Sequence, residues 1–178
     1  MMPVPTKAQV LDWFAAAKAN PFFRRGVIAA ALIAIADQAS KYWIVHVIAL
    51  PARRKIELSA IFDLTYVENR GASFGMLAGG IGSRVILSSI SIAVATALVI
   101  WLGRLNRRFA AVGATLIIGG AIGNLYDRVA YGYVVDFLDF SGLFFPWVFN
   151  IADAAINVGV GCLIVDALTH KADAAKPA

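Results

Sequence analysis

Four long apolar stretches constrain the fold of this chain more than any other feature. They cover about residues 26–49, 84–102, 109–126 and 150–168. Each is long enough to cross a membrane as a helix, which rises about 1.5 Å per residue. None shows the alternating pattern of a membrane β-barrel strand. The sequence therefore predicts an all-α polytopic membrane protein with four transmembrane helices.

Composition agrees with a membrane protein. The chain is 60% hydrophobic and 15% charged, whereas an average soluble domain has roughly 25% charged residues. The net charge of +5 would suggest nucleic acid in a soluble protein. Here most basic residues flank the apolar stretches, where anionic lipid attracts them. No nucleic-acid partner is expected.

An even number of spans places both termini on one side of the membrane, and the basic residues indicate which side. These residues precede the first span, fill the turn between the second and third spans, and lie in the tail: Lys7, Lys18, Arg24, Arg25, Arg104, Arg107, Arg108, Lys171 and Lys176. Both termini are therefore predicted to be cytoplasmic, although Arg53, Arg54 and Lys55 on the other side oppose this. A signal peptide cut after residues 34–36 is an alternative, but the apolar stretch continues past Lys41 as a full span.

The chain is predicted to form one membrane domain, residues 26–168, between a cytoplasmic interfacial segment, residues 1–25, and a cytoplasmic tail, residues 169–178. The first exterior segment, about residues 52–80, alternates apolar and polar residues and is predicted to form two short strands. The second, about residues 127–149, is rich in aromatic residues typical of a lipid interface. We expect the two segments to face each other across a site and to close over a substrate.

Polar residues inside the spans need an explanation, because a charged group in hydrocarbon is costly unless it is paired, hydrated or used. Asp37 and Lys41 are four residues apart, which favours a self-contained structural ion pair on one helix face. Gly119 and Gly123 have the spacing that lets two helices approach closely. The exterior end of the same span carries Asn124, Asp127 and Arg128.

Two aspartates are the candidate catalytic residues. Asp136 lies among apolar and aromatic neighbours in GYVVDF, and Asp153 lies at the start of the fourth span, on one helix face with Asn150 and Asn157. The intervening loop can fold back and bring the two aspartates together. Two carboxyls in one site would then share a proton, which is the arrangement needed to activate water against a peptide carbonyl.

Other chemistries are less well supported. His46 and His170 lie near opposite ends of the predicted protein and lack neighbouring ligands, so neither a metal nor another cofactor is expected. Cys162 lies inside the last span, and nothing supports a serine or cysteine nucleophile. From the residues alone, an aspartyl membrane hydrolase and a proton-coupled carrier are equally supported, and a non-catalytic assembly factor is a further alternative. A carrier usually has an internal repeat, and none is visible.

Three blocks, ENRGASFGML, GGAIGNLYDRVAYGYVVDF and FNIADAAINVG, resemble in this order the signatures of the lipoprotein signal peptidase family, also called signal peptidase II. DQASK in the first span also fits. The resemblance implies four transmembrane helices in the bacterial inner membrane, with a small periplasmic β-cradle and a short periplasmic helix. It implies an aspartyl endopeptidase that removes the signal peptides of diacylglyceryl-modified prolipoproteins by cutting immediately before the lipidated cysteine.

The resemblance also implies roles for individual residues. The family's catalytic pair falls on Asp136 and Asp153, near the periplasmic surface. Its supporting polar residues fall on Asp37, Asn69, Gly71, Asn124, Asp127, Arg128, Asn150 and Asn157. We expect Asp127 to hold Arg128, which would orient the substrate.

Two small departures bear on substrate preference: this chain has Ser73 and Ala154 where family members often have alanine and serine. The implied partners are prolipoproteins, membrane phospholipid and cyclic peptide antibiotics such as globomycin. A monomer is expected.

Overall fold

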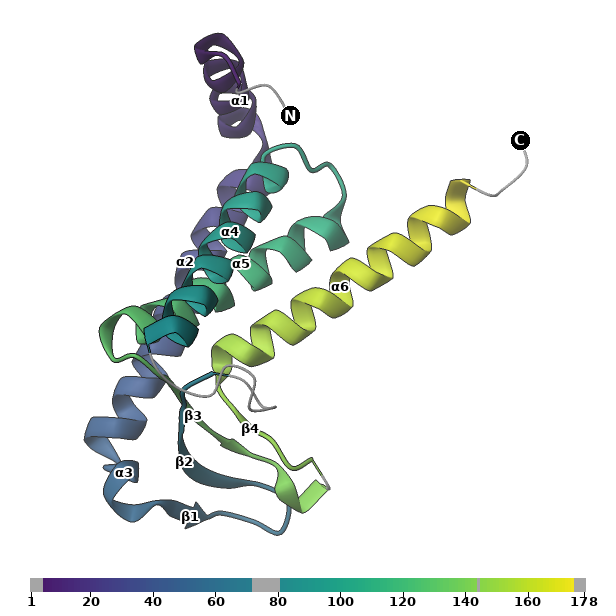
Figure 1. Cartoon of the computed structure of the whole chain (residues 1–178). Coiled ribbons are helices and arrows are strands. Elements are labelled where there is room, and N and C mark those ends of the chain that lie inside the picture. Colours follow the sequence, from purple (N-terminus) through teal and green to yellow (C-terminus); the bar gives the residue numbers. More distant parts are fainter. Residues whose placement is uncertain (1–4, 72–80, 144, 175–178) are drawn as a thin grey trace.

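Long apolar helices dominate the computed structural model, which describes residues 5–71, 81–143 and 145–174 (Figure 1). Within these ranges four helices are long and apolar enough to cross a membrane. They are α2 (Pro21–Tyr42), which continues into the π-helix η1 (Trp43–Val47), α4 (Ile81–Leu102), α5 (Arg108–Ala130) and α6 (Ile151–Ala174). The shorter helix α1 (Lys7–Ala19) precedes them. The predicted polytopic helical fold is confirmed.

The first span begins earlier than residue 26, where the apolar stretch starts. Asn20 caps α2, since its side-chain oxygen accepts a hydrogen bond from the backbone N–H of Phe22 at 2.9 Å. Pro21 follows at the first helical position, where its missing N–H costs nothing. Local capping chemistry therefore sets this end of the helix, and hydropathy alone does not reveal it.

A four-stranded antiparallel sheet lies at one end of the helices. Its strands, in the order β1-β2-β3-β4, are β1 (Lys55–Glu57), β2 (Asp63–Asn69), β3 (Val134–Asp139) and β4 (Val148–Phe149). The short helix α3 (Leu50–Arg53) leads into β1, and the 3-10 turn η2 (Ser141–Leu143) lies between β3 and β4.

The two exterior segments also pair with each other, which was not predicted from the sequence, while their closure over a substrate stays a prediction because residues 72–80 lie outside the described residues. The second segment supplies β3, which pairs directly with β2 and places Asp136 opposite Val67. A strand edge with unpaired N–H and C=O groups gains stability by adding a neighbour. The two segments are therefore one sheet, and they hold Asp136 in a buried strand.

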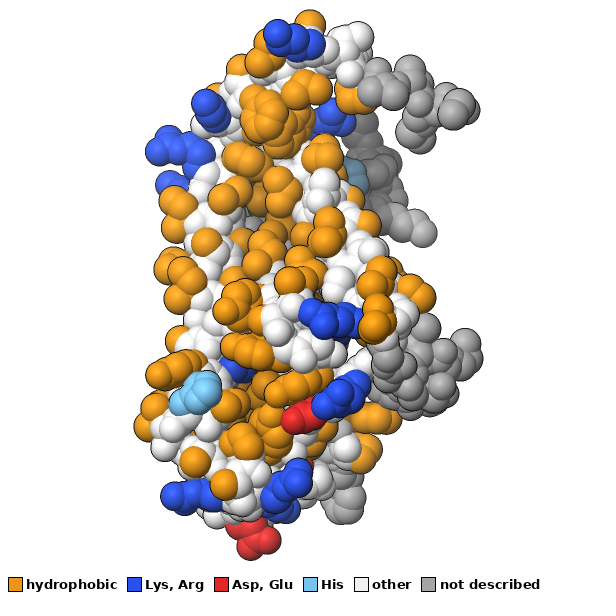
Figure 2. All heavy atoms as spheres, turned by 60° about the vertical axis from the view of Figure 1, so that its left-hand side comes forward, with side chains coloured by type: hydrophobic (Ala, Val, Ile, Leu, Met, Phe, Trp, Pro, Cys, Tyr) orange, Lys and Arg blue, Asp and Glu red, His pale blue; other side chains and the backbone are white. Residues whose placement is uncertain are grey.

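The sheet and the termini lie at opposite ends of the helices. Figure 1 shows β1 to β4 at one end, and α1 with the last turns of α6 at the other. Figure 2 shows one side of the molecule, where hydrophobic side chains cover the middle and Lys and Arg lie mainly toward the two ends. This distribution matches a hydrocarbon core between two charged interfaces.

Helix α5 is the central span, since it packs against α2, α4 and α6. Its glycines permit this close packing. A Cβ at Gly119 would lie 2.8 Å from the carbonyl oxygen of Ala30 on α2, and one at Gly113 would lie 2.7 Å from that of Gly159 on α6. A Cβ at Gly123 would lie 2.6 Å from the Asp37 carboxylate. The close approach predicted from Gly119 and Gly123 is confirmed.

Two glycines on α6 offer a matched test of this packing. A Cβ at Gly159 would lie 2.8 Å from the carbonyl oxygen of Gly113, whereas one at Gly161 would meet nothing within 4 Å. We predict that Gly159→Ala destabilises the detergent-solubilised protein by about 1–3 kcal/mol, because α5 and α6 must separate. Gly161→Ala should be neutral or stabilising, because alanine is the better helix former. Thermal unfolding followed by tryptophan fluorescence measures both, and equal melting temperatures would contradict the close contact.

Candidate active site

Asp136 is a buried carboxyl group on β3, one of the two inner strands of the sheet, with 2% of its surface exposed. Two amide side chains hold its two oxygens. Asn69, at the end of β2, donates to Oδ2 at 3.0 Å, and Asn150 donates to Oδ1 at 2.7 Å. Strand pairing therefore fixes the backbone of Asp136, and amides from two other segments fix its carboxyl group.

Asp153 lies in the first turn of α6, where Asn150 caps the helix. The backbone N–H of Asp153 donates to the Asn150 side chain at 2.9 Å, and the backbone N–H of Asn150 donates back to the Asp153 carboxylate at 3.3 Å. This reciprocal pattern is a capping box. Asn124 on α5 donates to the other Asp153 oxygen at 2.7 Å.

Asn150 joins the two aspartates. It is fully buried, and its side-chain amide bonds Asp136, Asn124 and the carbonyl of Val135 while its carbonyl oxygen caps α6. Each hydrogen-bonding atom of this side chain is used. One asparagine therefore sets the position of one carboxylate directly and of the other through the start of its helix.

Both aspartates line one cavity of about 700 Å³. Asn69 and Asn157 add amide groups to its wall, and the half-exposed rings of Phe145 and Trp147 add apolar surface. Asn157 also donates to the Asp153 carbonyl at 3.0 Å. The cavity thus combines two acids with apolar walls, which suits a ligand that has a polar backbone and an apolar chain.

Electrostatics favours a proton on Asp136. Burial, and then the negative charge of nearby Asp153, raises the pKa of Asp136 to about 7, although hydrogen bonds from Asn69 and Asn150 oppose the shift. The carboxyl group is therefore protonated in a large fraction of molecules near neutral pH. A neutral acid and a second carboxyl group then line the same cavity.

A buried ion cluster lies behind this site. The Lys41 ammonium lies 2.7 Å from Asp37 and 2.9 Å from Asp127, and it donates to Asn124 at 3.2 Å. Asp37 also accepts from the backbone N–H of Ala152 at 2.9 Å. The Asp37–Lys41 pair predicted as self-contained is therefore one part of a larger network that reaches α5 and α6.

The predicted pairing of Asp127 with Arg128 is wrong. Asp127 accepts from Lys41 and from the backbone N–H of Val135, whereas Arg128 donates to the Asn124 carbonyl at 3.4 Å. Adjacent helix positions point about 100° apart, so the two side chains diverge. The negative charges of Asp153, Asp136 and Asp127 all act on Arg128, with that of Asp153 the strongest.

Two further positions complete the comparison with the sequence. The backbone N–H of Gly71 donates to Asn69 at 3.1 Å, and its φ of 97° is one that glycine adopts without strain. Gln38, which the sequence reasoning missed, donates to Asp127 at 2.7 Å and to the Gly123 carbonyl at 3.1 Å. Its place in DQASK, between Asp37 and Lys41, was the available signal.

Comparisons with known proteins agree on one family. A family model described as signal peptidase (SPase) II matches residues 29–169. The lipoprotein signal peptidase of Caulobacter vibrioides is 48% identical over 147 residues, which cover 80% of this chain and 88% of that protein. The lipoprotein signal peptidase of Methylocella silvestris is 41% identical over 145 residues, 80% of this chain and 85% of that protein.

Solved structures give the same result. One structure of a bacterial membrane enzyme matches with a TM-score of 0.75 at 28% identity, over 86% of this chain and 93% of the other. A second matches with a TM-score of 0.70 at 32% identity, over 81% and 92%. The chain therefore belongs to the signal peptidase II family and is a multi-pass peptidase of the bacterial membrane.

Proposed function

We propose that this protein removes the signal peptides of diacylglyceryl-modified prolipoproteins, with Asp136 and Asp153 as the catalytic pair. One observation carries the assignment of the pair. The two carboxyl groups come from a strand and a helix that are separate in sequence, yet they line one cavity and both accept hydrogen bonds from Asn150, Asp136 from its side chain and Asp153 from its backbone N–H. The similar proteins of Caulobacter vibrioides and Methylocella silvestris are lipoprotein signal peptidases, which supports this substrate class.

In the proposed reaction, a water molecule lies between the two carboxyl groups. Asp153 takes a proton from this water as its oxygen attacks the scissile carbonyl carbon, and protonated Asp136 donates a hydrogen bond to the carbonyl oxygen. A tetrahedral intermediate forms without an acyl-enzyme. Asp153 then returns the proton to the leaving nitrogen, and the C–N bond breaks. The raised pKa of Asp136 supports its role as the acid.

The cavity walls suggest how a lipidated substrate binds. The peptide backbone would bond Asn69 and Asn157, while Phe145 and Trp147 contact apolar groups and the lipid chains stay in the bilayer beside α6. Cyclic peptide antibiotics such as globomycin would occupy the same cavity. Since one chain supplies both carboxyl groups, a monomer suffices for the reaction.

We also propose an orientation in which the sheet is periplasmic and both termini are cytoplasmic. The basic residues of the first helices and of the turn between α4 and α5 lie at the end opposite the sheet, which the positive-inside rule favours for the cytoplasm. Residues 26–168 then form the membrane domain, residues 1–25 and 169–178 flank it in the cytoplasm, and residues 52–80 and 127–149 form the periplasmic part.

The catalytic pair can be tested by cleavage of a diacylglyceryl-modified prolipoprotein with purified protein in detergent. Asp136→Asn and Asp153→Asn should each reduce the rate by about 10³-fold or more, because neither amide can act as base or acid. Both variants should remain folded, since asparagine keeps the size of the side chain. An unlipidated substrate should not be cut.

Asp139→Asn is the matched control, because Asp139 lies on the same strand as Asp136 but does not line the cavity. Its carboxylate accepts hydrogen bonds from the Thr65 hydroxyl and from the backbone N–H of Ser141. The control variant should retain most of the activity. Wild-type activity in either Asp136→Asn or Asp153→Asn would contradict the assignment of the catalytic pair. A folded wild type without any product would remove the proposed activity itself.

The pH dependence tests the proton on Asp136. If this group must be protonated, kcat/KM should fall as the pH rises through about 7, the raised pKa of Asp136. The hydrogen bond from Asn69 lowers that pKa. Asn69→Ala should therefore raise the pKa and move the alkaline limb to higher pH, while Asn106→Ala, an exposed control, should leave it in place. A limb that moves to lower pH would contradict the assignment.

Asp37 should act mainly through folding. Asp37→Ala leaves Lys41 with one fewer buried carboxylate, and breaking a buried ion pair costs about 3–5 kcal/mol. We predict a lower yield of folded protein and a lower melting temperature, with the rate per folded molecule changed less than about tenfold. Asp12→Ala, at an exposed position on α1, should change neither quantity. Loss of cleavage at a normal melting temperature would instead give Asp37 a direct role in catalysis.

A further inference from the structure

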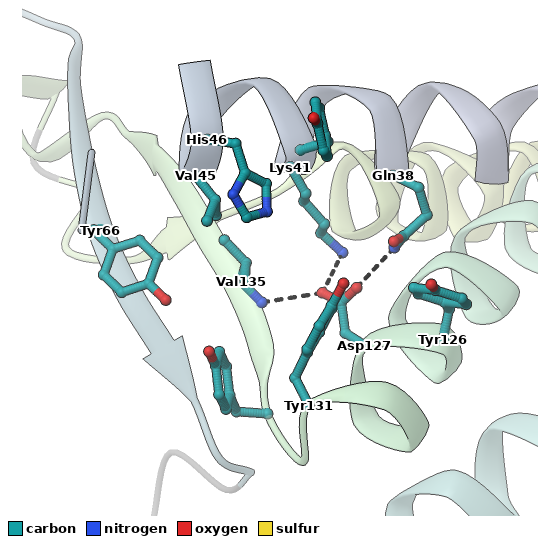
Figure 3. A pocket seen from close by; sticks show the side chains of 11 residues that line it. Gln38, Lys41, Val45, His46, Tyr66, Tyr126, Asp127, Tyr131 and Val135 are labelled. Carbon is teal, nitrogen blue, oxygen red and sulfur yellow. Dashed lines mark hydrogen bonds and ion pairs between the residues drawn. The ribbon is translucent and has the colours of Figure 1, made fainter. Parts of the chain in front are cut away.

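A second pocket of about 530 Å³ lies on the other side of β3 from the catalytic cavity. We call it the tyrosine pocket, because its wall contains Tyr42, Tyr66, Tyr126, Tyr131 and Tyr133 together with His46. Figure 3 shows these side chains around a common space, with labels on all of them except Tyr42 and Tyr133. Alternate residues of a strand point to opposite faces. Val135 accordingly lines the tyrosine pocket, and Asp136 lines the catalytic cavity.

The floor of the tyrosine pocket belongs to the buried ion cluster. Asp127, Lys41 and Gln38 lie there. Dashed lines in Figure 3 join Lys41 and Gln38 to Asp127. Lys41 already contacts Asp37, Asp127 and Asn124, so two carboxylates share one ammonium group. No other lysine or arginine lines the described part of this pocket. The floor therefore offers no free cation to an anionic ligand.

The walls favour a positive charge. The face of a tyrosine ring attracts a cation through its quadrupole, most strongly where water is excluded. One ring of the pocket already does this within the chain, since the Arg70 guanidinium carbon lies 5.3 Å from the ring centre of Tyr133. Tyr131 lies between two other rings: its ring centre is 6.3 Å from that of Tyr126 and 6.2 Å from that of Tyr133. The rings thus form a continuous aromatic wall.

The position of the tyrosine pocket limits what can enter it. Tyr42 lies at the end of α2 and Tyr126 near the end of α5, both toward the sheet, and both are more than half exposed. These are the ends of membrane-spanning helices, where phospholipid headgroups lie. The molecule that a bilayer supplies at this level, in great excess, is a phospholipid.

We propose that the tyrosine pocket binds the headgroup of an amine-bearing phospholipid, with the ammonium group among the tyrosine rings and the acyl chains along α2 and α5. The lipid phosphate would lie outside the rings, at the hydrated membrane interface. The site is separate from the proposed catalytic cavity, and its occupancy requires no peptidase activity.

Native mass spectrometry of the detergent-purified full chain tests the proposal. Phosphatidylethanolamine, phosphatidylglycerol and diacylglycerol with identical acyl chains are titrated separately, and thermal unfolding is recorded with each lipid. Phosphatidylethanolamine should bind most tightly and raise the melting temperature most. Tyr126→Leu and Tyr131→Leu should each weaken its binding about fivefold, whereas Tyr126→Phe should bind like the wild type, because the ring face remains.

Phe109→Leu is the matched control, because Phe109 is an exposed aromatic residue at the opposite end of α5. It should not change the binding. Equal binding of the three lipids, preference for phosphatidylglycerol, or unchanged binding by both leucine variants would each overturn the proposal. If a leucine variant does not fold, the lipid comparison on wild type and the Tyr126→Phe variant still decides the outcome.

Discussion

The position of a single buried ammonium group underlies much of this structure. Lys41 on α2 binds Asp37 on its own helix and Asp127 on α5. Each carboxylate also accepts a backbone N–H from a further element, Asp37 from Ala152 on α6 and Asp127 from Val135 on β3. Two helices and one strand are therefore fixed relative to α2 through one cation. Three buried charges are costly, but each has an opposite charge and hydrogen bonds within reach.

The proposed catalytic residues depend on this arrangement through their neighbours in sequence. Val135 precedes Asp136 and Ala152 precedes Asp153, so the carboxylates of the ion cluster hold the backbone one residue before each proposed catalytic group. Asn150 and Asn124 then fix the side chains. Hydrogen bonds to the backbone and to the side chains therefore both hold the site in place. A reaction that uses two carboxyl groups together requires such fixed positions.

Much of this arrangement could be predicted from the sequence, and what could not has a physical cause. Long apolar runs predict four spans because hydrocarbon requires them, and the motif around Asp136 and Asp153 predicts the pair. The partner of Lys41 across α5 could not be predicted, since Asp127 is far away in sequence and nothing local selects it. The participation of β3 in the sheet was hidden for the same reason, because VVDFLD, residues 134–139, fits both a buried strand and an apolar loop until β2 lies beside it. Asn150 was predicted as a supporting residue, but its contact with both aspartates exists only in three dimensions.

The several contacts of Asn150 have a consequence for drug resistance. A compound that bonds the two carboxyl groups lies against a side chain that also caps α6 and orders Asp136. Replacing that side chain would remove its hydrogen bond to Asp136, its cap on α6, or both, and would so disturb the proposed site itself. Substitutions that confer resistance would therefore be confined to the rim of the cavity, at exposed positions such as Phe145 and Trp147. A compound that contacts mainly Asn150 and the carboxyl groups of Asp136 and Asp153 would leave the fewest positions at which a substitution could confer resistance.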